Sequence, residues 1–231
     1  MADLSDAAKQ QLAKIAECVE VGKCDAQAKY PPSMVGEPGV DELVKQALDD
    51  GISSDRVLKD GLTKGMATIG VKFRDNEVYV PEVLLAARAM HKGMDHLRRT
   101  FVGNSAPSRG TIVMGTVQGD MHDIGKNLVC MMLEGAGWKV VDLGVDCPPE
   151  KFADTVAENP GCAVGLSALL TTTMLNMKPT IEAVRTKQTG AVVLIGGAPV
   201  TDDFAKEIGA SGFAPDPQGA IELLDDLVPA A

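Results

Sequence analysis

Residues 111–125 read TIVMGTVQGDMHDIG, an apolar run that passes into a polar turn and then into a helical pattern near Ile124. This order predicts a strand, a loop and a helix. His122 lies in the loop, where a neutral imidazole can bind a transition metal while the carboxylate of Asp120 holds its second ring nitrogen. Taken alone, the loop has an ordinary explanation, because single loop histidines are commonly structural and Asp120 could simply cap the helix.

Short apolar runs alternate with helical stretches throughout the chain after residue 110. Strands are expected at 111–117, 139–143, 163–167, 191–195 and 212–214, and helices near 124–136, 149–158, 173–188, 201–208 and 218–227. Runs as continuously apolar as Ala191-Val192-Val193-Leu194-Ile195 are typical of parallel strands buried on both faces. The pattern predicts a Rossmann-like, doubly wound, five-stranded parallel α/β domain over residues 111–231, with ligands bound at the carboxyl ends of its strands.

The first hundred residues have a helical periodicity instead. Apolar residues recur at steps of three and four, as in Leu4, Ala8, Leu12, Ile15 and Val19, which is typical of a helix with one buried face. Helices are expected at 4–21, 40–50, from Ser53 or Ser54 toward Val71, and from about Pro81 to Phe101. Short connections between them predict a four-helix bundle over residues 1–102. The small, polar, proline-containing segment 103–110 predicts a linker.

Length, charge and cysteine content restrict the class of protein. A chain of 231 residues can form two domains that each have a core, and its net charge of −10 argues against a nucleic-acid surface. No secretory leader and no membrane span are expected. Five cysteines without metal-ligand spacing predict reduced thiols in a cytoplasmic protein. A minor alternative makes Cys18 and Cys24 half of a metal site.

Three loops that follow expected strands carry unusual residues. They lie at 119–125, 165–173 and 196–199. The carboxyl ends of parallel strands lie at one edge of the sheet, so residues of these loops can meet. Each loop also has an ordinary explanation, since serine, threonine and glycine are common turn residues. The glycines do not form a G-x-G-x-x-G dinucleotide motif after the first strand.

The spacing between the three loops carries more information than any one of them. It reads D-x-H-x-x-G, forty-one residues, S-x-L, twenty-six residues and G-G. The residues are Asp120, His122 and Gly125, then Ser167 and Leu169, then Gly196 and Gly197. This pattern resembles the cobalamin-binding module of methionine synthase and, more closely, the corrinoid proteins of anaerobic methyltransferase systems. Residues 65–73 and 79–90 also resemble the helical cap of that family.

The resemblance implies that the chain binds cobalamin or a related corrinoid, carried as methylcobalamin. His122 would replace the cofactor's own benzimidazole as the lower cobalt ligand. Asp120 would accept a hydrogen bond from the other imidazole nitrogen, and the Thr173 hydroxyl would complete a proton relay. These three residues are the expected reactive group, with His122 as the metal ligand.

The displaced nucleotide tail would thread into the α/β domain, where a slot requires small residues. Gly115, Gly196 and Gly197 fit that requirement, and Thr116 and Ser167 could hydrogen-bond the tail. The complete set of cofactor-binding residues implied in this half is Gly115, Thr116, Val117, Asp120, Met121, His122, Asp123, Ile124, Gly125, Ser167, Leu169, Thr171, Thr173, Gly196, Gly197 and Ala198.

In the helical half, Tyr79, Val83, Ala87 and Met90 share one face of the expected fourth helix. They would either shield the methyl group on cobalt or belong to the bundle core. The resemblance implies a non-catalytic methyl carrier that cycles between Co(I) and methyl-Co(III). Its partners would be a substrate-specific methyltransferase, a second methyltransferase with a tetrahydrofolate or thiol acceptor, and a reductive activase.

Two other classes share the motif. One is the cobalamin-binding subunit of a B12-dependent mutase, in which a methyl cap is not expected. The other is a cobalamin-dependent transcription regulator, which requires a DNA-binding module. The chain has no basic helix-turn-helix and no spare length for such a module. We therefore expect the methyl carrier, with no nucleic acid and no membrane among its partners.

Overall fold

The chain divides into two compact units, Met1–Pro107 and Ser108–Ala231. The computed structural model describes residues 5–100 and 108–228. Most of the linker expected at 103–110 therefore falls outside the described residues, as do the expected helix ends at Leu4 and Phe101. Each unit is treated below by itself.

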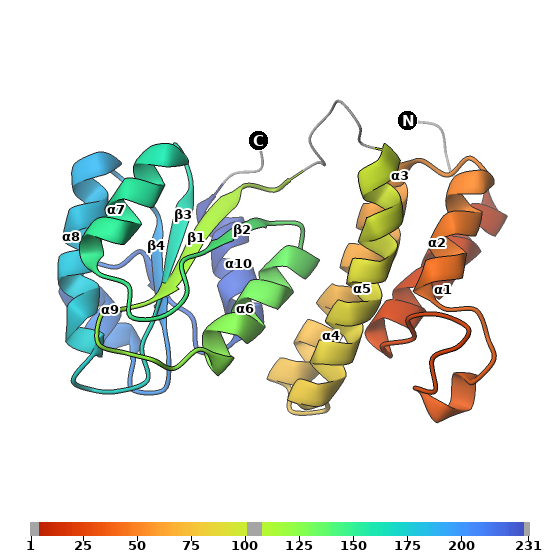
Figure 1. Ribbon diagram of the computed structural model, residues 1–231, viewed down its shortest axis with the longest axis horizontal. Helices are drawn as coiled ribbons and strands as arrows, with labels where there is room; N and C mark the ends of the chain where they lie inside the picture. The colour runs from red at the N-terminus through yellow and green to blue at the C-terminus, as the bar shows by residue number, and fades with distance from the viewer. Residues whose placement is uncertain (1–4, 101–107, 229–231) are drawn as a thin grey trace. The chain divides into compact units, whose positions relative to one another are not determined.

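The first unit is a bundle of four helical rods, as expected (Figure 1). Its elements are α1 (Asp6–Glu20), the short 3-10 turn η1 (Pro32–Met34), α2 (Val40–Asp49), α3 (Ser54–Arg56), the π-helical segment η2 (Val57–Thr63), α4 (Lys64–Arg74) and α5 (Val80–Thr100). The third rod joins α3, η2 and α4, where the periodicity predicts a uniform α-helix. Close packing accompanies the irregular turn, since a Cβ on Gly61 would lie 3.0 Å from Ile15 of α1.

The helix boundaries follow ordinary capping chemistry. The side chain of Ser5 accepts a hydrogen bond from the Ala8 N–H at the start of α1, and Ser53 does the same for Arg56 at the start of α3. Gly22, with φ of +73°, ends α1 in the left-handed conformation that glycine adopts without strain. Pro81 lies in the first turn of α5, where its missing N–H leaves no helical hydrogen bond unmade.

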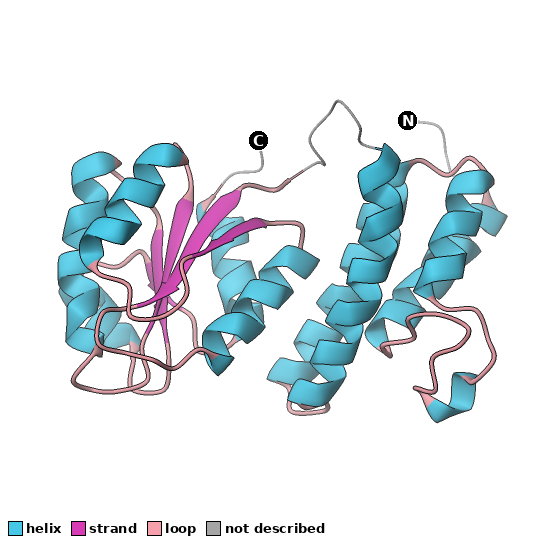
Figure 2. Cartoon of the chain, viewed as in Figure 1, coloured by secondary structure: helices cyan, strands magenta, loops and turns pink. Residues whose placement is uncertain are grey.

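The second unit is a five-stranded parallel sheet with the order β2-β1-β3-β4-β5 (Figure 2). The strands are β1 (Thr111–Thr116), β2 (Lys139–Asp142), β3 (Ala163–Ser167), β4 (Val193–Gly196) and β5 (Gly212–Phe213). The helices are α6 (Ile124–Gly135), α7 (Pro149–Glu158), the 3-10 turn η3 (Met174–Asn176), α8 (Met177–Lys187), α9 (Asp202–Ile208) and α10 (Pro217–Leu227). This confirms the doubly wound α/β prediction.

Two element boundaries differ from the expected ones for physical reasons. The stretch expected to be helical from residue 173 begins as a 3-10 turn and becomes α-helical only at Met177. Pro179 then falls in the first turn of α8, the position at which proline costs no hydrogen bond. Strand β4 starts at Val193 because the Ala191 N–H still closes a turn with the Gln188 carbonyl.

Helices α6 and α10 cover one face of the sheet, and α7, α8 and α9 cover the other (Figure 1). The change of side occurs between β1 and β3, because the chain leaves β1 toward β2 in one direction and continues from β3 to β5 in the other. In folds of this kind the crevice at the carboxyl end of that switch point binds ligands. The loop that contains His122 leaves β1 at this crevice.

Candidate functional site

His122 lies in the ligand loop, residues 117–123, which connects β1 to α6. The Thr116 hydroxyl donates a 2.9 Å hydrogen bond to the His122 carbonyl oxygen, and the Asp120 N–H donates to the Val117 carbonyl at 3.1 Å. The loop is thus folded back against the end of its own strand. The imidazole of His122 remains 53% exposed, so an approaching metal can reach it.

Asp120 is fully buried and uses both carboxylate oxygens. Its Oδ1 accepts from the His122 backbone N–H at 3.0 Å and lies 2.9 Å from His122 Nδ1. Its Oδ2 accepts from Thr173 Oγ1 at 2.6 Å and from the Leu169 N–H at 2.8 Å. A carboxylate can only accept, so Nδ1 carries the ring proton and Nε2 keeps the lone pair that a metal requires.

The electrostatic consequence for Asp120 is a strongly stabilised negative charge. Burial by itself raises the pKa of this carboxyl. The hydrogen bonds donated by Thr173, Leu169 and His122 outweigh burial and hold the pKa well below its usual range. Asp120 therefore stays ionised and keeps the ring of His122 oriented.

Two further residues hold the ligand loop, and the sequence analysis did not identify them. Asp146, in the loop between β2 and α7, accepts from the Gly119 N–H at 2.7 Å and donates its own N–H to the Asp120 carbonyl at 2.9 Å. On the other side, Asn176 Nδ2 donates to the Gln118 carbonyl at 2.8 Å. No spacing signal links these residues to His122. Their only hint in the sequence is a residue type that favours turns.

Exposed apolar side chains surround the two loops that Asp120 joins. We call this set the apolar rim, and its members are Met121, Ile124, Leu169, Leu170 and Leu175. Their exposed fractions lie between 42% and 77%. Large apolar side chains gathered at the mouth of a crevice indicate a surface that is covered when a ligand binds.

A row of small residues crosses the carboxyl edge of the sheet. Thr116 pairs in register with Ser167, and Ser167 pairs with Gly196. We call these three residues the small-residue row. One step earlier in the strands, the Met114 thioether lies over Gly165 and fills that level. The small-residue row carries only small side chains at the next level, where a Cβ on Gly196 would lie 3.0 Å from the Ala214 carbonyl oxygen.

The structure separates some of the residues expected at the slot. Gly115 points to the opposite face, where a Cβ would lie 2.6 Å from the Phe152 ring of α7, so its small size serves packing there. Val117 is also buried in the core on that face. Gly197 has φ of +127°, and a Cβ on it would overlap the Ala168 carbonyl oxygen. Ala198 and Thr171 are exposed near the same edge.

The stripe expected over the methyl face divides within the helical unit. Val83, Ala87 and Met90 are 0%, 2% and 3% exposed on α5, a helix that packs against α1, α2 and α4. Tyr79 directly precedes α5 and is 69% exposed. The three buried residues therefore have a packing role in the bundle, whereas Tyr79 offers a free ring.

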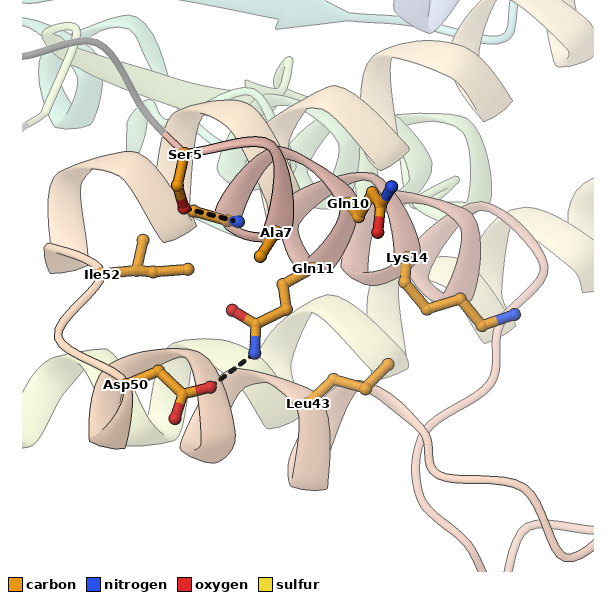
Figure 3. Close-up of a pocket in the computed structure, with 9 residues that line it drawn as sticks. Ser5, Ala7, Gln10, Gln11, Lys14, Leu43, Asp50 and Ile52 are labelled. Carbon is orange, nitrogen blue, oxygen red and sulfur yellow. Dashed lines mark hydrogen bonds between the residues drawn. The ribbon is translucent and has the colours of Figure 1, made fainter.

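A pocket in the described part of the helical unit involves none of the expected site residues. It has a volume of about 600 Å³, and Gln11 Nε2 donates to Asp50 Oδ2 across it at 2.5 Å (Figure 3). Its lining residues are Ser5, Ala7, Ala8, Gln10, Gln11, Lys14, Leu43, Asp50 and Ile52. It contains no metal-binding set of side chains, and we assign it no role in the chemistry.

The residues present suit a metal that is already coordinated by a macrocycle better than a bare metal ion. Within residues 5–100 and 108–228, no group of three or more histidine, cysteine, aspartate or glutamate side chains could hold a bare ion. Cys18 and Cys24 are buried free thiols whose pKa values are raised by burial. His122 would offer one nitrogen, and a corrin ring would itself supply the remaining nitrogen ligands. The exposed imidazole, the apolar rim and the small-residue row match such a group.

Comparisons with known proteins identify the family of the chain. Residues 110–221 match the family model of a B12 binding domain, and residues 36–98 match a second B12 binding domain model. The chain is 38% identical over 194 residues to a corrinoid protein of Desulfitobacterium hafniense (strain Y51), covering 82% of this chain and 90% of that one. It is 37% identical over 202 residues to the trimethylamine corrinoid protein of Methanosarcina barkeri, covering 85% and 92%.

A solved structure extends the match to the fold. The crystal structure of a cobalamin-binding protein from Desulfitobacterium hafniense DCB-2 superposes with a TM-score of 0.71 at 26% identity, over 96% of this chain and 98% of that chain. The fold and the site thus define a B12-binding protein. Within that class, the chain belongs to the family of corrinoid proteins. No helix in the part of the chain that the structure describes has the length and apolar character needed to span a bilayer.

Proposed function

We propose that this protein carries a methyl group on the cobalt of its corrinoid, between a substrate-specific methyltransferase and a second methyltransferase. The observation that supports it most is the pairing of His122 Nδ1 with Asp120 Oδ1 at 2.9 Å. This contact leaves an exposed Nε2 as the only nitrogen of the ligand loop that can bind cobalt from below. A carrier requires such a ligand, because an axial nitrogen stabilises the methylated state.

The ligand loop and its contacts perform the protein's part of this function. When bound, the corrinoid supplies a cobalt that alternates between Co(I) and methyl-Co(III). His122 would hold the cobalt through Nε2, in the base-off, His-on form. Asp120 fixes the tautomer and the direction of the ring, and Thr173 fixes Asp120 through its 2.6 Å hydrogen bond.

The remaining residues accommodate the ligand. The apolar rim would contact the corrin ring. The displaced nucleotide tail would be held along the small-residue row, with Gly197 and Ala198 beside it. Thr116 contributes mainly through the His122 carbonyl that it already holds. In the helical unit, the exposed ring of Tyr79 is our candidate for shielding the methyl group, and the buried Val83, Ala87 and Met90 support the helix that presents it.

The partners follow from the carrier role. One relative is named as a trimethylamine corrinoid protein and another as a dimethylamine corrinoid protein, both from Methanosarcina. We propose an analogous cytoplasmic system with a substrate-specific methyltransferase, an acceptor methyltransferase that uses tetrahydrofolate or a thiol, and a reductive activase. The partner enzyme selects the methyl donor. Affinity capture with the holoprotein should therefore retain the methyltransferase, and the substrate of that enzyme identifies the donor.

The deciding experiment changes His122 and observes the cobalt directly. The reconstituted Co(II) protein labelled with ¹⁴N-histidine should show an electron paramagnetic resonance spectrum split by one axial nitrogen, and ¹⁵N-histidine should change the splitting from three lines to two. His122→Gly should abolish this label dependence and weaken corrinoid binding by about 10- to 100-fold. His96→Asn, at a histidine paired with Asp41 in the helical unit, is the control. Splitting that still depends on the histidine label in the His122→Gly protein would disprove the assignment.

A further inference from the structure

Gln218, in the first turn of α10, has a buried oxygen without a partner. Its side chain is 7% exposed, and its Nε2 donates to Glu222 Oε1 at 3.1 Å. Its Oε1 accepts no hydrogen bond. Among the side chains the structure describes, only one other buried polar atom is in this situation, the Trp138 Nε1. Leaving a buried carbonyl oxygen unpaired is unfavourable, so such an atom requires an explanation.

The position of Gln218 can be fixed along the strands. In the same helix, Leu223 packs against Gly212, where a Cβ would lie 3.4 Å from its side chain, and Gly212 is in register with Leu194. Helix α10 follows β5 and so begins at the carboxyl edge of the sheet. Gln218 precedes Leu223 by five residues, which moves it about 7.5 Å toward that edge.

A similar distance along β4 separates Leu194 from the small-residue row. Gly196, a member of that row, lies two residues beyond Leu194, about 6.6 Å closer to the carboxyl edge. Gln218 is buried together with Ile221 and Leu224 on α10, a helix that packs against α6 and contacts the sheet through Leu223. Along the strand direction, Gln218 therefore lies at the level of the small-residue row.

The chemistry of the missing partner is defined by the existing contact. Nε2 already donates to Glu222, and the atom left without a partner is Oε1, so the missing hydrogen bond is one that Gln218 accepts. The partner must be a hydroxyl or an N–H. We infer that Gln218 Oε1 accepts a hydrogen bond from the nucleotide tail of the corrinoid, donated by a ribose hydroxyl or by a donor group on the base. This inference rests on the proposed function, which places the tail in the slot.

The inference implies a residue that selects for the tail and not for the corrin ring. Dimethylbenzimidazole carries no hydrogen-bond donor once it is joined to ribose, whereas an adenine base carries an exocyclic amine. Cobinamide lacks the nucleotide altogether. Comparing these three corrinoids therefore separates a contact to the ribose, a contact to the base and a merely structural role.

The test is a titration of the full-length apoprotein with cobalamin, an adenine-containing cobamide and cobinamide, followed by absorbance. Gln218→Met keeps the volume and removes the acceptor, together with the Nε2 hydrogen bond to Glu222. It should weaken the binding of at least one nucleotide-containing corrinoid by about 3- to 10-fold and leave cobinamide binding unchanged. Because the oxygen lacks a partner in the unliganded protein, any fall in the melting temperature of the apoprotein reports the loss of the Nε2–Glu222 hydrogen bond. Trp138→Phe, which removes the other unpaired atom, should alter no affinity.

Each outcome decides the matter. Equal weakening for cobalamin and the adenine cobamide supports a ribose contact, and a loss limited to the adenine cobamide supports a contact to the base. Unchanged binding of both nucleotide-containing corrinoids would overturn the inference, as would an equal weakening for cobinamide. Failure of the proposed function is seen separately, because the wild-type protein would then bind none of the three corrinoids or would show no histidine coordination.

Discussion

Thr173 Oγ1 donates a 2.6 Å hydrogen bond to Asp120 Oδ2, although 53 residues separate the two in the chain. The contact ties the loop after β3 to the ligand loop after β1. Asp120 also accepts hydrogen bonds from the Leu169 N–H, the His122 backbone N–H and His122 Nδ1. One carboxylate therefore sets the conformation of two loops and the direction of the imidazole. The site is therefore assembled around Asp120.

Thr173→Val should destabilise the apoprotein by a similar amount at pH 7 and at pH 3.5. The pKa of Asp120 is lower in the folded protein than in the unfolded chain, where it is about 3.9. The ionised carboxylate thus contributes stability above pH 4, which is lost as the pH falls from there toward the folded value. Because folded Asp120 remains ionised at both pH values, removing one donor should cost about 1–2 kcal/mol at each. Urea unfolding at both pH values measures the cost, with the exposed Thr171→Val as the control. A cost that disappears at pH 3.5 would mean that folded Asp120 is already protonated there and would contradict this account.

Substitutions of Asp146 should separate its carboxylate from its backbone conformation. Its φ is +51°, a conformation that asparagine and glycine tolerate better than alanine. Asp146→Asn keeps an acceptor for the Gly119 N–H, Asp146→Gly removes it without strain, and Asp146→Ala removes it and adds strain. We expect corrinoid affinity and unfolding free energy to fall in that order, by up to about 2 kcal/mol in stability. Asp154→Ala, at an exposed carboxylate on α7, should change neither. Equal effects for all three variants would show that the hydrogen bond from the Gly119 N–H to the Asp146 carboxylate is unimportant.

Gly197→Ala should be more harmful than Gly190→Ala. Both glycines have positive φ, but nothing lies within 4 Å of a Cβ at Gly190, whereas one at Gly197 would overlap the Ala168 carbonyl oxygen. Strain alone should cost about 1–2 kcal/mol at Gly190. The overlap should add about 1–3 kcal/mol at Gly197. Thermal unfolding of the apoproteins gives both values, and similar melting temperatures would refute the close approach.

The five thiols should be unreactive in the native protein. All of them are buried, and burial raises the pKa of Cys18 to about 11 and that of Cys130 to about 12. Since the thiolate is the reactive form, a colorimetric disulfide reagent at pH 8 should label none of the five until denaturant is added. Rapid labelling of one thiol in the native protein would mean that the core around it opens.

Much of this architecture was predictable because it depends on local patterns. The alternation of strands and helices predicted the parallel sheet, and the spacing of Asp120, Ser167 and Gly196 predicted which loops meet. The small-residue row shows the same logic, since its members end three neighbouring strands. Residues at strand ends are brought together by topology alone.

Other parts depend on three-dimensional contacts that leave no periodic signal. The π-helical segment at Val57–Thr63 accompanies the close approach of Gly61 to α1. The contacts of Asp146 with the ligand loop depend on a left-handed backbone at one aspartate among many. Gly115 looked like a slot residue because its face in the sheet cannot be known before the partner helices are placed. The stripe on α5 was ambiguous for a similar reason, since core and cap faces both require apolar residues.

The concentration of contacts on Asp120 also has an evolutionary consequence. A substitution there would disturb the ligand loop, the loop after β3 and the imidazole at once, so almost no substitution of Asp120 should be tolerated. Thr173 supplies only one of the donors and can be exchanged for another hydroxyl residue at little cost. Under the proposed function, substitutions at position 173 can therefore adjust how firmly cobalt is held without a change of the histidine.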